Sequence, residues 1–458
     1  MEANDAFMPQ RRWVFDGAAI GAIGLIAALA LACNEKAKLP IESGMGPAPA
    51  LPSPKKSMLP TVNIAPAVGW PRDGKPAAAP GLTVNAFAGE LAHPRWLHVL
   101  PNGDVLVAET NAPPKPDDSK GFRGWIMRRQ MAKAGAAVPS ADRITLLRDR
   151  DGDGVAETRV TFLESLHSPF GMALVGGDFY VANSDAVVRF PYADGETRIE
   201  AAGTKLVDLP AGPINHHWTK SLIASPDGAK LYATVGSNSN VGERGMEVEQ
   251  GRAAIWEIDR KTGAHRIFAS GLRNANGMAF EPETGALWTV VNERDELGSD
   301  LVPDYLTSVR DGGFYGWPYS YFGAHVDARV KPQRPELVAT AIVPDYALGA
   351  HTAALGLARA RGDALPSTYA QGMFIGMHGS WNRNPASGYQ VIFVPFEKGK
   401  PSGSPVAVIG GFLSEKGEAF GRPVGVAVDA QGALLVADDV GNKIWRVTGD
   451  ERSASAQP

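Results

Sequence analysis

The sequence predicts an all-β protein that folds as a six-bladed β-propeller. The chain has 458 residues, with 52 glycines and 35 prolines, a turn-rich composition that suits strands better than helices. From Pro80 onward, a unit of apolar strand, turn and second apolar strand recurs six times, at spacings of roughly 50 to 80 residues. Such long repeats with several strands each are typical of propeller blades. A two-domain β-sandwich arrangement is the alternative.

The six repeats share a buried strand, a tight turn and a returning strand. They cover residues 96–108, 170–182, 221–236, 277–290, 355–376 and 424–437. Three further apolar runs, at 253–258, 390–396 and 443–447, are predicted as outer strands of the blades. An insertion at 123–137 is rich in Arg, Met, Ala and Gln, which favours a short helix.

The N-terminus is predicted to lie outside the fold. Two arginines, Arg11 and Arg12, precede an apolar run over 18–32, which is typical of an export signal. The lone Cys33 excludes an internal disulfide and stands where a bacterial lipoprotein signal places its lipidated residue. An uncleaved membrane anchor and plain secretion are the alternatives. We therefore expect an exported, periplasmic protein that is anchored to the membrane through Cys33 or an N-terminal helix.

The chain thus divides into four parts. We predict a signal peptide or anchor over 1–33, a flexible Pro/Ala-rich linker over 34–66, the propeller over 67–450 and a disordered tail over 451–458. The net charge of −4, without a long basic tract, argues against nucleic acid as a partner. The sequence also lacks the glycine-rich loops that cradle nucleotide phosphates.

Polar clusters fall just before the first strand or just after the second strand of a repeat. Because those two strand ends meet at one edge of a blade, the clusters are predicted to share one rim. They include the pair His216 and His217, the pair Arg273 and Asn274, and Arg422. A base and fixed cations around one axis suit an anionic ligand. The alternative for the histidines is a loop pair satisfied by backbone, and His351 and His378 in neighbouring loops have no assigned role.

Two acidic loops suggest a metal. The loop from Glu293 to Asp300 offers carboxylates and carbonyls that suit Ca²⁺, and a solvated charged loop is the alternative. The stretch from Asp149 to Gly154 resembles the start of a calcium-binding EF-hand loop, but its twelfth position is Val160 rather than glutamate. A β-turn is the preferred interpretation there, and a structural Ca²⁺ site is the alternative.

Several segments together resemble the glucose/sorbosone dehydrogenase family, and above all its membrane-bound, L-sorbosone dehydrogenase-like branch. The resemblance extends from about Leu59 to Val447 and is carried by residues 93–96, 101–109, 272–274, 315–318 and 378–383. Members of this family are six-bladed propellers that bind pyrroloquinoline quinone (PQQ) and Ca²⁺ and oxidise sugars. The same fold and cofactors are therefore expected here.

The resemblance also implies roles for individual residues. It makes His217 the catalytic base, and it places Arg273 and Asn274 beside the quinone carbonyls. Arg422 matches one of two arginines that hold the cofactor carboxylates, whereas the second is replaced by Val424.

The remaining implied roles concern the metal and the departures from the family pattern. The carbonyls of Arg294 and Asp295, with Tyr315, match the calcium site. Trp381 and Arg383 stand where a lysine is expected, so Trp381 is predicted to stack on the cofactor, unless it is a core tryptophan. Arg383 or Lys220 is expected to compensate for the missing cations.

The function implied is oxidation of a sugar or sugar aldehyde, an aldose or sorbosone-like substrate, at a CH–OH or aldehyde group by hydride transfer to PQQ. A cytochrome or a membrane quinone would accept the electrons. Two other hypotheses remain open. One is a metal-dependent propeller lactonase, which could recruit Glu109, Asn274 and Asp438. The other is a propeller that binds protein or glycan without catalysis.

Overall fold

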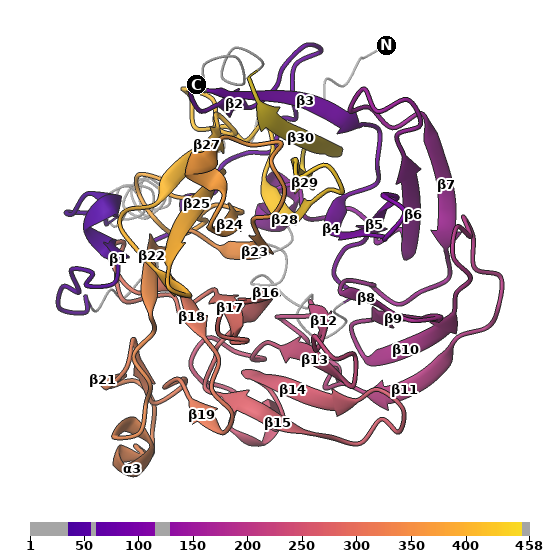
Figure 1. Ribbon diagram of the computed structural model, residues 1–458. Coiled ribbons are helices and arrows are strands. Elements are labelled where there is room, and N and C mark those ends of the chain that lie inside the picture. Colours follow the sequence, from indigo (N-terminus) through magenta and orange to yellow (C-terminus); the bar gives the residue numbers. More distant parts are fainter. Residues whose placement is uncertain (1–34, 56–60, 115–128, 451–458) are drawn as a thin grey trace, which may run out of the picture.

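The computed structural model describes residues 35–55, 61–114 and 129–450. Over these residues the chain forms six mostly antiparallel sheets around a common axis (Figure 1), so the predicted six-bladed propeller is confirmed. Each of the six predicted repeats supplies the two innermost strands of one blade. None of the helices within the described ranges has the length and hydropathy of a membrane span.

The blades are numbered here by the chain order of their innermost strands. Blade 1 contains β4 (Pro94–Val99), β5 (Val105–Glu109), β6 (Arg143–Arg148) and β7 (Thr158–Leu163). Blade 2 contains β8 (Met172–Val175), β9 (Asp178–Ala182), β10 (Ala186–Pro191) and β11 (Thr204–Asp208). Blade 3 contains β12 (Leu222–Ala224), β13 (Lys230–Val235), β14 (Ala254–Asp259) and β15 (His265–Ser270), with β19 (Gly313–Phe314) added in parallel.

The other three blades take additional strands from the first part of the chain. Blade 4 contains β16 (Ala275–Phe280), β17 (Leu287–Val291), β18 (Pro303–Ser308), β22 (Tyr346–Ala350) and β1 (Met45–Gly46). Blade 5 contains β23 (Ala354–Arg359), β24 (Gly372–Met377), β25 (Gln390–Glu397), β26 (Lys400–Pro401), β27 (Val406–Gly410) and β2 (Ala77–Ala78). Blade 6 contains β28 (Pro423–Val428), β29 (Leu434–Asp438), β30 (Lys443–Gly449) and β3 (Leu82–Ala88).

Short elements complete the fold. They are η1 (Ile41–Gly44), η2 (Glu247–Glu249), η3 (Ser367–Tyr369), the helix α3 (Pro335–Val338) and a ribbon of β20 (Ser320–Tyr321) with β21 (His325–Val326). Residues 129–133 are helical, in agreement with the helix predicted within 123–137, of which 123–128 lie outside the described residues.

Blade 6 closes the ring with strands from both ends of the chain. Its outermost strand β3 comes from the N-terminal part and pairs with β30 from the C-terminal part, with Leu82 opposite Gly449 and Asn85 opposite Arg446. Because this pairing joins the two ends by backbone hydrogen bonds, the ring of blades does not depend on a disulfide.

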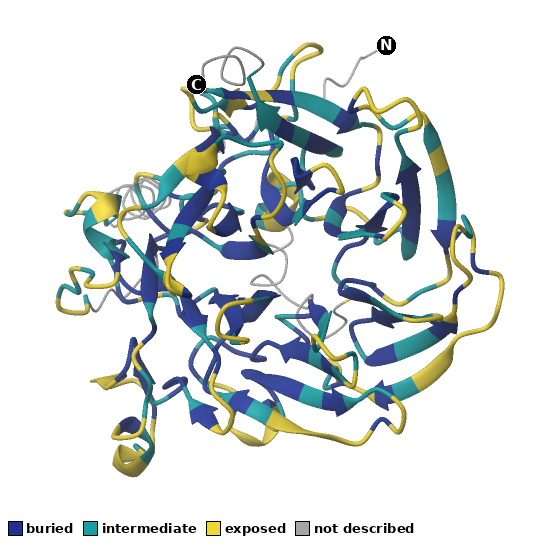
Figure 2. Cartoon of the chain, in the orientation of Figure 1, coloured by how far each residue is buried: buried dark blue, intermediate teal, exposed yellow. Residues whose placement is uncertain are grey.

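Burial follows the position of a strand within its blade. The second strand β5 is buried at every residue, whereas the outer strand β11 is mostly exposed (Figure 2). Glycine recurs where the innermost strands converge. A Cβ on Gly171 would lie 2.2 Å from the Leu222 nitrogen, and one on Gly356 would lie 2.2 Å from the Val424 carbonyl oxygen. The recurring glycine of the repeats therefore allows the close approach of neighbouring blades.

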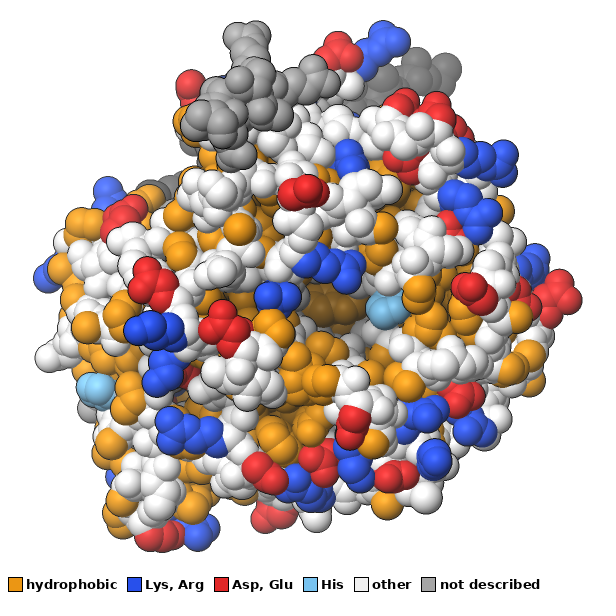
Figure 3. Space-filling view, in the orientation of Figure 1, with side chains coloured by type: hydrophobic (Ala, Val, Ile, Leu, Met, Phe, Trp, Pro, Cys, Tyr) orange, Lys and Arg blue, Asp and Glu red, His pale blue; other side chains and the backbone are white. Residues whose placement is uncertain are grey.

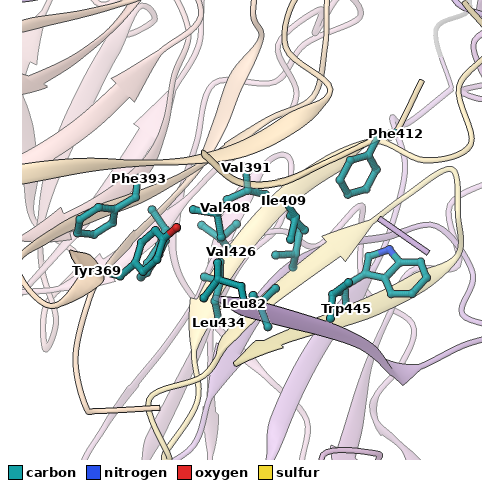
Figure 4. Close-up of a cluster of buried hydrophobic side chains, with 14 of the residues drawn as sticks. Leu82, Tyr369, Val391, Phe393, Val408, Ile409, Phe412, Val426, Leu434 and Trp445 are labelled. Carbon is teal, nitrogen blue, oxygen red and sulfur yellow. The ribbon is translucent and has the colours of Figure 1, made fainter. Parts of the chain in front are cut away.

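The hydrophobic core lies between successive blades. Between blades 5 and 6, side chains of β25 and β27 face those of β28, β29 and β30 (Figure 4), and the labelled residues include Phe393, Ile409, Val426, Leu434 and Trp445. Fully burying one such side chain contributes about 1.5 to 3 kcal/mol. These interfaces hold the blades, and the loops on them, in fixed positions.

The segment predicted to be a flexible linker differs from expectation over residues 35–55. It packs on blades 4 and 5: β1 pairs with β22, and the Lys38 nitrogen donates to Asp300 Oδ2 at 2.8 Å. Composition favours flexibility here, but the backbone finds partners in the rim loops. The export and lipidation predictions for Arg11, Arg12 and Cys33 fall outside the described residues.

Candidate functional site

The loops at one rim of the propeller gather the polar residues singled out in the sequence. His217 precedes β12, Arg273 and Asn274 precede β16, and Arg422 precedes β28. Strand pairing places the start of each innermost strand beside the end of the second strand, as Pro423 opposite Asp438 and Ala275 opposite Val291 show. The prediction of a shared rim follows from this antiparallel pairing. The end of the propeller seen in Figure 3 is hollowed around the common axis of the blades, with basic side chains at the edge of the hollow.

His217 is held in an orientation that suits a base. Its Nδ1 lies 2.7 Å from the carbonyl oxygen of Ser237, so Nδ1 carries the proton and Nε2 keeps its lone pair. Burial, and next the positive charge of Arg273, hold the pKa of His217 well below its usual value. The ring is therefore neutral at neutral pH and able to accept a proton.

Asn274 lies beside His217 with an unused acceptor. A Cβ on Gly236 would lie 2.5 Å from His217 Cβ and 2.4 Å from Asn274 Oδ1, so the glycine allows these two side chains to approach each other. The buried Asn274 Oδ1 has no hydrogen-bond partner among the described residues. Orphaned buried acceptors are rare in folded proteins and indicate a site that receives a further group.

Arg273 is buried and fixed by hydrogen bonds to four residues: Asn240, Asn292, Glu293 and Asp295. Its Nη1 donates to the Glu293 carbonyl at 2.6 Å, and its Nη2 donates to Asn240 Oδ1 at 3.0 Å and Asp295 Oδ2 at 3.1 Å. Asn240 follows Ser237 by three positions, so one loop orients both the histidine and the arginine. This preorganised cation can stabilise negative charge that develops near it.

Asp295 joins blades 4 and 5 at the rim. Its Oδ1 accepts a hydrogen bond from Asn382 Nδ2 at 2.7 Å and lies 3.5 Å from His351 Nδ1. Burial alone would raise the pKa of the Asp295 carboxyl, but the Arg273 charge and the His351 hydrogen bond hold it well below its usual value. The hydrogen bonds and charge of Asp295 in turn outweigh burial and raise the pKa of His351.

A second charged cluster lies where blades 5, 6 and 1 meet. Asp439 Oδ2 lies 2.6 Å from Arg95 Nη1, 2.9 Å from His378 Nε2 and 3.6 Å from His93 Nε2. Burial lowers the pKa of His93 to about 4, against the raising effect of Asp439. The Arg95 guanidinium lies 5.8 Å from the centre of the Trp218 ring. Because Trp218 follows His217 directly, this contact joins the Asp439 cluster to the loop that precedes blade 3.

Arg422 belongs to this second cluster. It is buried, its guanidinium lies 5.1 Å from the Tyr389 ring, and Nη2 donates to the Ala65 carbonyl at 3.2 Å. Its Nε and that of Arg95 are buried donors without partners in the described part of the chain. The arrangement offers two arginines with spare donors to an anion.

Lys220 and Arg383 do not join the rim cations as expected. Lys220 is fully buried, and its Nζ donates to the carbonyls of Trp218 at 3.2 Å and His217 at 3.4 Å, which holds the loop of the base. Arg383 donates to the carbonyls of Ser299 and Pro385, and so it fixes loops rather than facing the axis. The Arg383 guanidinium and the Lys220 ammonium both donate to backbone carbonyls, and the sequence alone does not show which carbonyls are available.

The side chains of the three residues of the predicted calcium site are bonded to other residues, whereas the ligands expected from Arg294 and Asp295 are their backbone carbonyls. Arg294 pairs with Asp327 at 2.8 Å, and the Tyr315 hydroxyl donates to the Ser308 carbonyl at 2.6 Å. The Asp295 carboxylate is occupied by Arg273 and Asn382. Trp381 is an exposed rim residue rather than part of the core, as expected for a stacking surface, and its neighbour Asn382 contacts Asp295.

The carboxylates that a lactonase would need are already saturated. Glu109 accepts hydrogen bonds from Arg143 Nε and Nη2 at 2.9 and 2.8 Å, as well as from Thr145 and the Ala92 nitrogen. Asp438 accepts from two tryptophan side chains and two backbone nitrogens. These two side chains serve the fold, which weakens the hydrolase hypothesis.

The acidic loop after β6 is organised by the Asp149 side chain. Asp149 Oδ1 and Oδ2 accept hydrogen bonds from the nitrogens of Gly152 and Gly154 at 2.8 and 2.9 Å, which bends the backbone around the carboxylate. The exposed carboxylates of Asp151, Asp153 and Glu157 lie within 4.8 Å of Asp149 and of one another. Exposed acidic groups of this kind occur without a metal, and so the Ca²⁺ alternative stays a prediction.

Comparison with known proteins decides the family. The model of the TrAA12-like family matches residues 141–304 and 337–450, which is more than half of the chain. The chain belongs to the TrAA12-like family. The resemblance to PQQ-dependent sugar dehydrogenases is thereby confirmed at the level of the family, whereas no finding singles out a sorbosone-specific branch.

Two kinds of relatives accompany this TrAA12-like protein. The aldose sugar dehydrogenase YliI of Escherichia coli is 30% identical over 314 residues, which are 66% of this chain and 79% of that protein. An uncharacterised protein of Borreliella burgdorferi is 28% identical over 298 residues, which are 63% and 77% of the two chains.

Among solved structures, the PQQ domain of pyranose dehydrogenase from Coprinopsis cinerea superimposes with a TM-score of 0.66. It is 19% identical, and the match covers 84% of this chain and all of that chain. A Trichoderma reesei enzyme of family AA12 gives the same score and identity over 85% of this chain and 99% of its own. At these identities the likeness shows the fold, which the TrAA12-like chain shares.

The sequence reasoning missed the Asp439 cluster of this TrAA12-like protein. His93 and Arg95 lie in a segment that carries the family resemblance, but the sequence assigns neither a role, and it does not single out Asp439. One clue was present: acidic residues follow the second strand in three repeats, at Glu109, Glu293 and Asp438. The rim rule applied to those positions would have pointed to this cluster.

Proposed function

We propose that this TrAA12-like protein is a quinoprotein oxidoreductase that oxidises a sugar or sugar aldehyde, with hydride transfer to PQQ. One observation carries the proposal: a neutral histidine, oriented by the Ser237 carbonyl at Nδ1, shares a rim with the fixed Arg273 and with two arginines whose Nε donors have no partner in the described chain. The family and the sugar dehydrogenases among its relatives support the same chemistry. An aldose or a sorbosone-like aldehyde is the proposed substrate class.

The residues present fit PQQ, which carries three carboxylates and two adjacent quinone carbonyls. Arg422 and Arg95 have buried Nε donors without partners in the described ranges and would hold carboxylates. Arg273 and Asn274 would face the quinone carbonyls from blade 4.

When bound, PQQ supplies the electrophilic carbon that accepts a hydride. The protein supplies the proton transfer and the field. His217 Nε2 takes the proton of the sugar hydroxyl as general base, while its Nδ1–H stays bonded to the Ser237 carbonyl. The resulting imidazolium is stabilised by that hydrogen bond. Arg273, fixed by Asp295 and Asn240, stabilises the negative charge that develops on the oxygen in front of it.

The side chains at the predicted calcium site have protein partners, so its expected ligands are the backbone carbonyls of Arg294 and Asp295, as the resemblance implies. The Tyr315 hydroxyl and the Asp295 carboxylate are both engaged by protein partners, and the Arg294 side chain points to Asp327. A hard cation needs several free oxygen ligands. Ca²⁺ as a cofactor stays a prediction from the resemblance.

We further propose that the protein acts outside the cytoplasm, anchored in the periplasm through Cys33 or an N-terminal helix. The apolar run at 18–32 supports this location. A cytochrome or a membrane quinone outside the cytoplasm would then accept the electrons.

The test is a titration of the purified apoprotein with PQQ, with and without Ca²⁺, followed by dye reduction with aldoses and aldehydes. We expect a saturable cofactor spectrum and dye reduction with at least one sugar. His217→Ala should keep the titration midpoint and lose turnover by about 10²- to 10⁴-fold. Absence of any cofactor spectrum would refute the proposal. Hydrolysis of a sugar lactone would favour a hydrolase, and glycan binding without turnover a binding propeller.

A further inference from the structure

The chain enters the propeller at the rim of the site. Glu35 accepts hydrogen bonds from the Ser299 nitrogen at 2.7 Å and the Ser299 hydroxyl at 3.0 Å, and the Ala37 nitrogen donates to the Asn384 carbonyl at 2.7 Å. Ser299 follows Asp295 by four positions, and Asn384 follows Asn382 by two. The first described residues therefore lie against the two loops that orient Arg273.

This attachment leaves little free chain between the propeller and the proposed anchor. The apolar run at 18–32 ends at Cys33, two positions before Glu35. Two fully extended residues span at most about 7 Å. A bilayer that holds the apolar run, or a lipid on Cys33, must therefore lie close to Ser299 and Asn384. The far end of the propeller axis cannot turn toward that bilayer.

We propose that the rim of the site faces the lipid bilayer and rests on its surface. The proposal depends on the anchored location proposed above, and it adds an orientation and a contact surface. The bilayer is the expected partner of this rim because the proposed anchor holds it close to Ser299 and Asn384.

The surface of the rim suits a bilayer. Large apolar side chains on it are exposed by 41 to 52%, and we call them the rim patch: Val62, Val68, Met131, Val138 and Trp381. The Asn63 nitrogen bonds the Trp381 carbonyl at 2.7 Å, and the Ala67 nitrogen bonds the Lys133 carbonyl at 2.9 Å, so the backbone brings Val62 near Trp381 and Val68 near Met131. Single exposed apolar residues are common, but a connected group marks an interaction surface.

Charge and residue type agree with a lipid partner. Lys36, Lys38 and Lys133 are exposed beside the rim patch. Each basic side chain near an anionic lipid surface contributes about 1 kcal/mol, and tryptophan favours the headgroup region. The exposed Trp381 is adjacent to Asn382, which bonds Asp295, so contact with lipid would extend to the loop that orients Arg273.

The orientation can be measured on the full chain in liposomes of phosphatidylcholine and phosphatidylglycerol. An environment-sensitive fluorophore is attached to Val62→Cys or Val68→Cys in the rim patch. The control is Ala229→Cys, an exposed position in the turn between β12 and β13 at the opposite rim. The labelled wild-type chain gives the background from Cys33. We expect brominated lipids to quench both rim labels several-fold more strongly than the control label.

Equal quenching at the three positions, or stronger quenching at the control, would overturn the proposal. So would a full chain that fails to float with the liposomes, because the anchor would then be absent. The measurement needs neither PQQ nor turnover. A failed PQQ titration would therefore refute the proposed function without affecting the proposed orientation. Equal quenching would refute the orientation without affecting the proposed function.

Discussion

Replacing Arg422 by methionine tests the cofactor-binding part of the proposed site. The guanidinium is buried, its Nε has no partner among the described residues, and its only hydrogen bond there is the 3.2 Å contact of Nη2 to the Ala65 carbonyl. Methionine keeps most of the volume against Tyr389 but removes the charge. A hydrogen bond to a charged group contributes about 1.5 to 3 kcal/mol. The Kd for PQQ should therefore rise about 10- to 150-fold.

The assay is a fluorescence titration of apoprotein with PQQ, together with a thermal melt that confirms folding of the variant. Arg361→Met is the matched control, because Arg361 is exposed and bonds the Val428 carbonyl at the end of β28 away from the site rim. The control should titrate like the wild type. A midpoint within twofold of wild type for Arg422→Met, or an equal shift in the control, would refute the assignment.

Three further predictions concern the same rim. Asp295→Asn leaves the buried Arg273 without its carboxylate partner and should lower the free energy of unfolding by about 3 kcal/mol. Urea unfolding measures this loss, and a loss below about 1 kcal/mol would contradict the pairing. Because burial depresses the pKa of His217, kcat/KM should stay level from pH 8 down to about 6.5 and fall only below it, and a fall beginning near pH 8 would point to another base. Burial also depresses the pKa of Lys220, so the unfolded chain binds more protons than the folded one, and stability rises with pH toward the ordinary lysine pKa near 10. Lys220→Met should flatten this rise of Tm with pH. An unchanged slope would contradict a depressed pKa for a buried Lys220.

The scaffold could be predicted because its pattern is local. The strand-turn-strand units are read from consecutive residues, and antiparallel pairing then dictates that loops before the first strand and after the second share a rim. His217, Arg273, Asn274 and Arg422 all lie there. The glycine of the repeats had no explanation in the sequence, and the structure supplies one: at Gly171 and Gly356 a side chain would collide with the next blade.

The direction of individual side chains could not be predicted in the same way. Arg383 and Lys220 stand at rim positions, yet each turns to backbone carbonyls that come from loops or from its own turn. Tyr315 lies in a segment that matches the family, but its hydroxyl bonds the carbonyl of Ser308. Such choices depend on which acceptors tertiary folding leaves unpaired, and sequence spacing contains no information about them.

The balance of charge explains why Arg422 is the decisive cation of the rim. Arg273 is neutralised by Asp295, and Arg95 by Asp439, at 3.1 and 2.6 Å. The side chain of Arg422 has only an aromatic ring and one carbonyl as recorded partners in the described chain. An anion that enters the rim therefore gains most from Arg422, while the two paired arginines fix geometry and leave His217 neutral. This division predicts that cofactor affinity depends chiefly on blade 6 and that turnover depends on blades 3 and 4.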